Sequence, residues 1–228
     1  MFFFDFDYFL IVGPAFLLAI WAQFKVKSAF NKYSQTGTRS GMTGAQVAQE
    51  ILRANGIDDV KVEGVRGFLS DHYDPRTKTL RLSPDVFQGR SQASVAVAAH
   101  EVGHAIQHAQ GYAPLKLRSA LVPAVQLGSW VATPVFFLGM MLTPLLFVGV
   151  IAFGLIALFQ LITLPVEYNA SSRALSEIER LGIVGGAEME GARKTLNAAA
   201  LTYVAAVAQT LLTILYFLLR LGLLGGDD

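Results

Sequence analysis

Residues 119–166 read SALVPAVQLGSWVATPVFFLGMMLTPLLFVGVIAFGLIALFQLITLPV, and none of these 48 residues is Asp, Glu, Lys or Arg. A helix needs only about 20 apolar residues to cross the hydrocarbon core of a bilayer. The run is therefore too long for one span and fits two, which we expect at 121–141 and 145–164, joined by a tight turn at 143–144. A water-soluble protein has no use for such a run, so the sequence predicts an integral membrane protein.

Two further uncharged runs lie on either side of this stretch. Residues 8–24 form the first, and residues 195–219 form the second, in which we place a span at 198–219. A secretory signal peptide carries basic residues before its apolar run. Here Asp5 and Asp7 come first and lysines follow, so 8–24 is interpreted as a retained membrane anchor.

The composition excludes several classes of protein. The chain of 228 residues is 53% hydrophobic and only 15% charged, whereas an ordinary soluble domain carries about 25% charged residues. Its net charge of +1 disfavours nucleic-acid binding, and its apolar content disfavours disorder. The absence of cysteine excludes disulfide bonds, thiol nucleophiles and zinc–thiolate sites. Any metal ion must therefore be bound by His, Asp or Glu.

The basic residues are confined almost entirely to two polar segments. Residues 25–118 contain 13 Lys and Arg and residues 167–194 contain 4, so together they hold 17 of the chain's 18. Cytoplasmic segments of membrane proteins are enriched in Lys and Arg. We therefore expect both segments in the cytoplasm and both termini, which are acidic, outside. Four spans place the two polar segments on the same side of the membrane.

The polar segments show the patterns of a small α+β domain. Capping residues predict where helices start, and alternation of apolar and polar residues predicts strands. The fold class expected is a mainly α membrane protein with four transmembrane helices and a small cytoplasmic α+β domain. The first expected cytoplasmic element is a helix from the capping box of Thr43 and Gln46 to Asn55. Strands at 60–65 and 79–83 follow, forming a hairpin or meander around turn residues 71–78. The remaining elements are a helix at 91–110, capped by Ser91, and a helix-turn-helix at 172–194.

The helix expected at 91–110 contains the motif HEVGH at residues 100–104. Residues four apart lie about 40° apart around a helix and one turn along it, so both imidazoles can reach one metal ion. Glu101 is offset around the helix, where it faces a water molecule at the ion instead of binding the ion. We interpret the motif as a zinc site with Glu101 as general base. The alternative is a helix with a polar stripe.

A catalytic zinc ion needs a third protein ligand and an open position. His108 continues the four-residue spacing, but the successive offsets turn it away on a straight helix, so we expect it beside the site or at the surface. His72, in a turn, is a looser candidate. Glu167 follows Pro165 at the cytoplasmic end of a span, where it is expected to begin a helix, and is the better candidate. The alternative role of Glu167 is to complement the helix dipole.

Four stretches of the chain carry a resemblance to a known family. HEVGHAIQH, preceded by DHYDP and LRLSPDVF and followed by PVEYNASSRA, resembles the bacterial membrane-bound neutral zinc metallopeptidases of the YugP type. The resemblance covers most of the chain, including the four-span pattern. The sequence is more distantly similar to HtpX and CAAX prenyl proteases, whose His-His-Glu zinc sites face the cytoplasm or lie within a membrane chamber.

The resemblance implies the identity of the site residues. It implies a zincin-like cytoplasmic domain and a gluzincin-like enzyme of the bacterial inner membrane that binds one Zn²⁺ per chain. The ligands implied are His100, His104 and Glu167, with Glu101 as the catalytic base.

The sequence departs from the more distant relatives at one position. The third-ligand motif of the HtpX type is Glu-x-x-Ala-Asp, and its Asp orients a ligand histidine. Ser171 stands at that position here. Asn169 or Arg173 are candidates to replace the missing carboxylate, and Asp71 is a candidate from the hairpin.

The function expected is that of a membrane-anchored zinc metalloendopeptidase that hydrolyses peptide bonds of membrane or membrane-proximal proteins. Its partners are then a protein or peptide substrate and the lipid bilayer, with no nucleic acid. Because the motif lies in a polar helix and not in a span, we expect cleavage beside the membrane. The candidate donors to the transition state are Arg173, His72, Tyr168 and Tyr203.

Other roles for these segments remain open. The strand that contains Leu80, Arg81 and Leu82 is a candidate edge for an extended peptide substrate, and its alternative role is core packing. A non-catalytic membrane scaffold stapled by zinc, or an assembly factor that binds partners through its spans, are the alternative functions. A glutamate between the histidines argues against a staple, because a staple needs no base.

Overall fold

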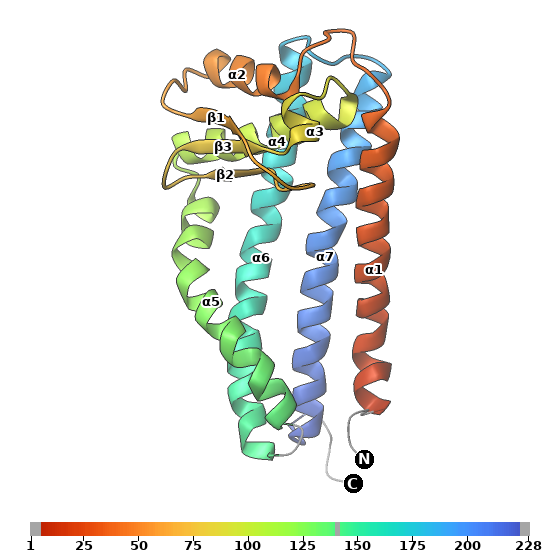
Figure 1. The fold of residues 1–228 in the computed structure, drawn as a ribbon. Helices are drawn as coiled ribbons and strands as arrows, with labels where there is room; N and C mark the ends of the chain where they lie inside the picture. The colour runs from red at the N-terminus through yellow and green to blue at the C-terminus, as the bar shows by residue number, and fades with distance from the viewer. Residues whose placement is uncertain (1–5, 140–141, 224–228) are drawn as a thin grey trace. The chain divides into compact units, whose positions relative to one another are not determined.

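The computed structural model describes residues 6–139 and 142–223, apart from the side chains of residues 133, 136 and 143. Met141, the expected end of the second span, and the acidic tail residues Asp5, Asp227 and Asp228 lie outside the described residues. The chain is mainly helical and contains one small sheet (Figure 1). The elements are α1 (Phe6–Ser34), α2 (Gly44–Ala54), β1 (Lys61–Gly64), β2 (His72–Asp74), β3 (Thr79–Leu82), α3 (Pro84–Phe87), α4 (Gln92–Ala109), α5 (Ala113–Gly139), α6 (Thr143–Arg180) and α7 (Glu188–Arg220).

The chain folds as two compact units. The first contains the described residues of Met1–Gln23, Leu117–Leu164 and Leu201–Asp228, and the second contains Phe24–Lys116 and Pro165–Ala200. Apolar helical segments make up the first unit, whereas the second combines the two polar segments that are far apart in the sequence. The candidate site residues of the sequence analysis, Tyr203 excepted, belong to the second unit.

Three helices of the described chain are long and apolar enough to cross a membrane, namely α1, α6 and α7. α5 is not among them. In the first unit the large apolar side chains point outward, as shown by the exposed fractions of Leu17 (69%), Trp130 (82%) and Ile151 (75%). Outward apolar surface of this kind is expected where the surroundings are lipid. A small cluster of Val12, Leu146, Tyr216 and Phe217 fills the interior of this unit.

The end of the third expected span differs from the prediction. We expected a helix to begin near Glu167, but α6 runs unbroken from Thr143 to Arg180 and includes Pro165. A proline removes one backbone N–H from a helix, and helices of membrane proteins tolerate that loss. Glu167 therefore lies inside a helix, and it does not complement a helix N-terminus. The expected turn residues 143–144 likewise begin α6.

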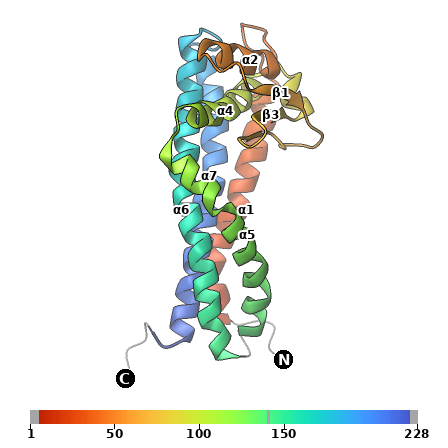
Figure 2. The same cartoon turned by 90° about the vertical axis from the view of Figure 1, so that its left-hand side faces the viewer.

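α5 contains two prolines, Pro123 and Pro134. Figure 2 shows that this helix changes direction along its length, as prolines inside a helix cause. It begins at Ala113, several residues before the span predicted at 121. Residues 113–120, which precede the predicted second span, therefore belong to the same helix as that span.

The caps predicted for the second unit are confirmed. The side chain of Thr43 accepts a hydrogen bond from the N–H of Gln46, and Oε1 of Gln46 accepts one from the N–H of Thr43. Ser91 caps α4 by accepting a hydrogen bond from the N–H of Ser94. α6 and α7 form the predicted helix-turn-helix, with Gly182 at φ +64° after the last turn of α6.

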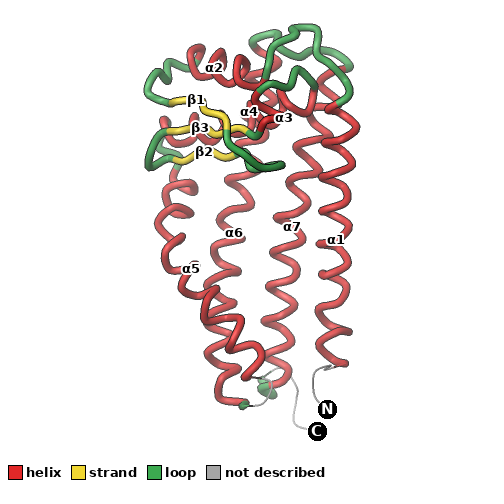
Figure 3. Tube along the Cα trace, viewed as in Figure 1, coloured by secondary structure: helices red, strands yellow, loops and turns green. Residues whose placement is uncertain are grey.

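The sheet has the strand order β1-β3-β2 (Figure 3). The two predicted strands, β1 and β3, pair in parallel, so the hairpin or meander expected between them is wrong; the antiparallel hairpin is formed by β2 and β3 instead. Residues 72–74, predicted as turn, are strand. β3 is the central strand, so both of its edges are already paired, and the prediction that Leu80, Arg81 and Leu82 offer an edge to substrate is wrong. β2 and β3 both contact α4.

The core of the second unit joins segments from both parts of the sequence. Apolar residues of α2, β3 and α4 pack together with residues of α6 and α7. Leu80 and Leu82 of β3 are fully buried in this core. Burial of such side chains stabilises a fold by about 1.5–3 kcal/mol each. The fully buried members of this core include Val47, Ala48, Ile51, Leu80, Leu82, Val95, Val102, Ile178 and Ala192.

Candidate metal centre

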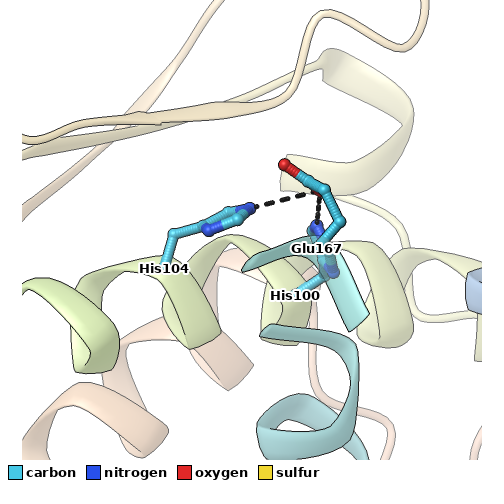
Figure 4. Close-up of side chains that lie close together, drawn as sticks. All are labelled: His100, His104 and Glu167. Atoms are coloured by element: carbon cyan, nitrogen blue, oxygen red, sulfur yellow. Dashed lines mark hydrogen bonds and ion pairs between the residues drawn. The ribbon is translucent and has the colours of Figure 1, made fainter. Parts of the chain in front are cut away.

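The two histidines of the HEVGH motif lie one turn apart on α4, and Glu167 approaches them from α6 (Figure 4). The Nε2 atoms of His100 and His104 lie 3.2 Å and 3.5 Å from Oε2 of Glu167. One ligand atom from each residue lies within 4.8 Å of the others. Among the described residues, no other group of three or more His, Cys, Asp or Glu side chains lies close enough together to hold one metal ion.

These separations fit a zinc ion. Zinc–donor distances of about 2.0–2.1 Å in a tetrahedron place two donors about 3.3 Å apart, and the two measured separations of 3.2 Å and 3.5 Å lie on either side of that value. The donor set of two imidazoles and one carboxylate suits zinc, and it leaves one tetrahedral position free. The residues present therefore fit the ion that the motif predicts.

The carboxylate of Glu167 is buried, with only 3% of the residue exposed. Burial raises the pKa of Glu167, but hydrogen bonds from His100 and His104 outweigh that effect, and the pKa lies well below its ordinary value. The carboxylate is therefore ionised at neutral pH. A metal ligand has to be deprotonated, so the site holds Glu167 in the form that binds.

A glycine allows α4 to come close enough to α6 for the three ligands to meet. A Cβ atom at Gly103 would lie 2.5 Å from the carbonyl oxygen of Ala170. Ala170 is itself fully buried. No side chain fits at Gly103 without displacing the backbone of α6, so this position of the motif is restricted by packing.

His100 is oriented by the residue at which the sequence departs from the distant relatives. Its Nδ1 atom lies 3.1 Å from the hydroxyl of Ser171. Ser171 is four residues after Glu167 and therefore on the same face of α6. The candidates Asn169, Arg173 and Asp71 hydrogen-bond to Gln107, Gln110 and Ser83 instead. Ser171 itself contacts the ligand histidine. The spacing from Glu167 could have indicated it.

His104 is oriented by a residue that the sequence analysis missed. Nδ1 of His104 lies 3.1 Å from Oε1 of Gln107, which is fully buried. The amide nitrogen of Gln107 donates to the carbonyl of Val166 at 2.8 Å and to Oδ1 of Asn169 at 2.9 Å. These acceptors fix the amide so that its oxygen faces His104, which leaves Nε2 of His104 directed at the metal position. The three-residue spacing on one helix face was the available signal.

Asn169 and Arg173 complete this network one step further out. Oδ1 of Asn169 also accepts a hydrogen bond from Nε of Arg173 at 2.7 Å, and Nη1 of Arg173 donates to Oε1 of Gln110 at 2.7 Å. The guanidinium group lies 5.9 Å from the ring centroid of Tyr112. Both predicted residues therefore support the site indirectly, through Gln107.

Glu101 is buried beside the ligands, with 8% of the residue exposed. Burial raises the pKa of Glu101 to about 7; the neighbouring His100 opposes the rise, whereas the charges of Glu167 and Asp71 add to it. Its carboxylate also accepts a hydrogen bond from the backbone N–H of Tyr73 in β2. A carboxylate with a pKa near the working pH is suited to take up and release a proton.

The structure places the remaining candidates away from the three ligands. His72 is exposed at the start of β2, and its Nδ1 atom contacts the carbonyl of Ser70 at 2.9 Å. Asp71 accepts hydrogen bonds from the N–H and the hydroxyl of Ser83, and so connects the start of β2 to the cap of α3. Nδ1 of His108 lies 2.8 Å from the hydroxyl of Tyr73. As expected, His108 is beside the site and not a member of the ligand group.

Comparisons with known proteins identify the family. Residues 8–222 match the family described as "Putative neutral zinc metallopeptidase". The chain belongs to this neutral zinc metallopeptidase family. A relative from Bacillus subtilis (strain 168), named "Putative membrane protease YugP", is 51% identical over 205 residues, which cover 89% of this chain and 91% of the relative. No solved structure matches the chain.

Membership agrees with the site just described. The matched residues include both histidines of α4 and Glu167 of α6. A neutral zinc metallopeptidase needs a metal site of this kind, and the chain offers one whose three members fit zinc. The resemblance inferred from the sequence motifs is thereby confirmed.

Replacing Gln107 with alanine in the metallopeptidase is expected to weaken zinc binding by about 10–100-fold, because His104 loses the acceptor that orients its ring. Competition with a chromophoric chelator on the purified full chain measures the affinity. Gln110→Ala is the matched control, since Gln110 caps the end of the same helix and contacts Arg173 instead of a ligand. Equal zinc affinities for the two variants would contradict the role given to Gln107.

Gly103→Ala is expected to reduce both the zinc content and the thermal unfolding midpoint, because the added methyl group forces α4 away from Ala170. A helical glycine with open space around it, Gly154, provides the control. Gly154→Ala should leave both quantities unchanged or raise the midpoint slightly. If Gly103→Ala bound a full complement of zinc at wild-type stability, close helix packing would not be what assembles the site.

Proposed function

We propose that the chain is a zinc-dependent endopeptidase, gluzincin-like in its His-His-Glu ligand set, that binds one Zn²⁺ per chain through His100, His104 and Glu167. The observation that carries this proposal is the position of Glu101. It follows the first ligand on α4 and is buried beside the ligand group, and its pKa is raised to about 7. A metal site with a purely structural role has no use for a buried carboxyl group in that state.

In the proposed reaction Glu101 is the general base. His100, His104 and Glu167 would hold the zinc ion, which would supply Lewis-acid polarisation of the scissile carbonyl and of the attacking water. The Glu101 carboxylate takes a proton from the attacking water and then delivers it to the nitrogen of the departing amine. The N–H of Tyr73 holds the carboxylate in place before the reaction. Gln107 and Ser171 keep the two histidine rings in their binding orientations.

The proposed topology has four membrane spans, with α5 as the fourth beside α1, α6 and α7. The length and apolar composition of three of these helices support it, and the uncharged run at 119–166 supports the span in α5. The concentration of 17 of the 18 Lys and Arg in the two polar segments favours a cytoplasmic site with both termini outside. We infer a location in the bacterial inner membrane, as the family resemblance implies.

The proposed substrates are membrane proteins or proteins close to the membrane surface. The ligand histidines lie on α4, which is not one of the helices suited to cross a membrane. Cleavage is therefore proposed beside the bilayer and not within it. The name of the Bacillus subtilis relative, a membrane protease, supports this class of activity.

Two isosteric substitutions at the two buried carboxylates separate catalysis from metal binding. Glu101→Gln should retain the wild-type zinc content and lose about 10²–10⁴-fold in the rate of cleavage of fluorescein-labelled casein, because only the general base is removed. Glu167→Gln should lose zinc on dialysis against a chelator, and with it all activity. Zinc content and initial rates are measured on the purified full chain.

The outcomes distinguish the enzyme from a zinc-stapled scaffold. Full proteolysis by Glu101→Gln would contradict the assignment of the base. Absence of zinc-dependent cleavage in the wild type, with zinc bound, would favour the scaffold. Unchanged zinc content in Glu167→Gln would remove Glu167 from the ligand set.

The proposed orientation is tested with single cysteines, which the cysteine-free chain allows without any background. Gln49→Cys on α2 and Glu179→Cys on α6 are exposed positions in the two polar segments. In intact cells both should resist a membrane-impermeant maleimide, and both should react after the cells are lysed. Labelling of either residue in intact cells would contradict a cytoplasmic site.

A further inference from the structure

The second unit exposes few large apolar side chains. Within its residues, all of which the structure describes, these are Phe24 (70% exposed), Phe68 (52%), Leu69 (37%) and Tyr168 (47%). Phe24 ends the first uncharged run and Tyr168 follows the long one, so both lie where a proposed span leaves the membrane. Phe68 and Leu69 lie in the middle of a polar segment, and the span ends do not explain their exposure.

Phe68 and Leu69 form the tip of a loop at residues 66–70, which we call the apolar loop. It connects β1 to β2 (Figure 3). Leu69 has φ +52°, a conformation that bulky residues rarely adopt, and Gly67 has φ +118°. The hydroxyl of Ser70 closes the loop by donating to the carbonyl of Arg66 at 3.2 Å. The backbone thus holds a strained turn whose apolar side chains remain outside the core.

The apolar loop lies against α1 close to the end of the first span. The ring of Phe68 contacts the ring of Phe30 edge to face, with centroids 5.6 Å apart. Phe30 follows Phe24 by six residues, which is about 9 Å along a helix. The layer of lipid headgroups begins where the apolar run of α1 ends, and it is about 5–8 Å thick on each side of the bilayer. The loop is therefore at the level of the headgroups or just beyond them.

Basic residues lie at the start of the apolar loop and just after the first expected span. Lys25 and Lys27 follow Phe24 on α1, and Arg66 begins the loop. Basic residues beside apolar side chains bind the interface between anionic headgroups and acyl chains.

We propose that the apolar loop places Phe68 and Leu69 in the lipid headgroup layer of the bilayer. This inference rests on the part of the proposed function that makes α1 a membrane span. It assigns a second membrane contact to the unit that carries the metal centre, besides the helices themselves.

The proposed contact connects the lipid surface to the general base. The loop leads directly into Asp71, which accepts a hydrogen bond from the N–H of Ser83, and then into β2. In β2 the N–H of Tyr73 donates to the carboxylate of Glu101. Anchoring the loop therefore fixes the strand that borders the site at a set height above the bilayer, which favours substrates that emerge from the membrane.

The test measures the depth of a nitroxide spin label at residue 69. The full chain carrying Leu69→Cys is labelled and reconstituted in vesicles of phosphatidylcholine and phosphatidylglycerol. Collision with oxygen, which concentrates in lipid, is compared with collision with a water-soluble nickel chelate. Leu17→Cys, on the exposed face of α1, is the bilayer reference, and Gln49→Cys, exposed on α2 of the same unit, is the aqueous reference.

The inference predicts an oxygen-to-nickel ratio at residue 69 several-fold above that at residue 49 and below that at residue 17. Adding Phe68→Ser should move the label at residue 69 toward the aqueous value. A ratio equal to that at residue 49, or shielding of the label from both reagents, would overturn the inference while leaving the span intact. An aqueous ratio at residue 17 would instead contradict the span, and with it the membrane topology of the proposed function.

Discussion

The metal centre depends on how closely α4 packs against α6. At Gly103 the two backbones approach so closely that a Cβ atom would lie 2.5 Å from the Ala170 carbonyl. That approach brings Glu167 to within 3.2 Å and 3.5 Å of the two imidazoles. Residues 67 positions apart in the chain thus form one ligand group, and the second unit consists of the two segments that carry them.

Close packing of two helices also buries polar groups, and the metal ligands among them have hydrogen-bond partners. An unpaired buried charge costs several kcal/mol, by order of magnitude. Here Glu167 is paired with two histidines, His100 with Ser171, and His104 with Gln107, whose own amide is paired with Val166 and Asn169. Glu101 is the exception. It gains one backbone hydrogen bond, and burial leaves its pKa raised to about 7, which is the property a proton-transfer group requires.

The sequence predicts the parts of this site that rest on local periodicity and fails where distant segments decide. Four-residue spacing on one helix was enough to pair His100 with His104, and Ser91 marked where that helix begins. The same reasoning ended a helix at Pro165, because local propensity does not show that a helix continues through a proline supported by its neighbours. It made β3 an edge strand, because alternation does not reveal that β1 returns to pair with it in parallel. Gln107 escaped notice because a polar residue on a helix is usually solvated, and only tertiary packing buries it beside His104.

In the proposed metal centre two imidazoles and one carboxylate hold a zinc ion, and one coordination position is left open. Zinc K-edge X-ray absorption on the purified, zinc-loaded full chain tests it most directly, because it counts the imidazole ligands around the ion. The account predicts two imidazoles, one carboxylate and one solvent oxygen, with His72 and His108 uninvolved. A shell of three imidazoles, or of four protein ligands without solvent, would contradict it.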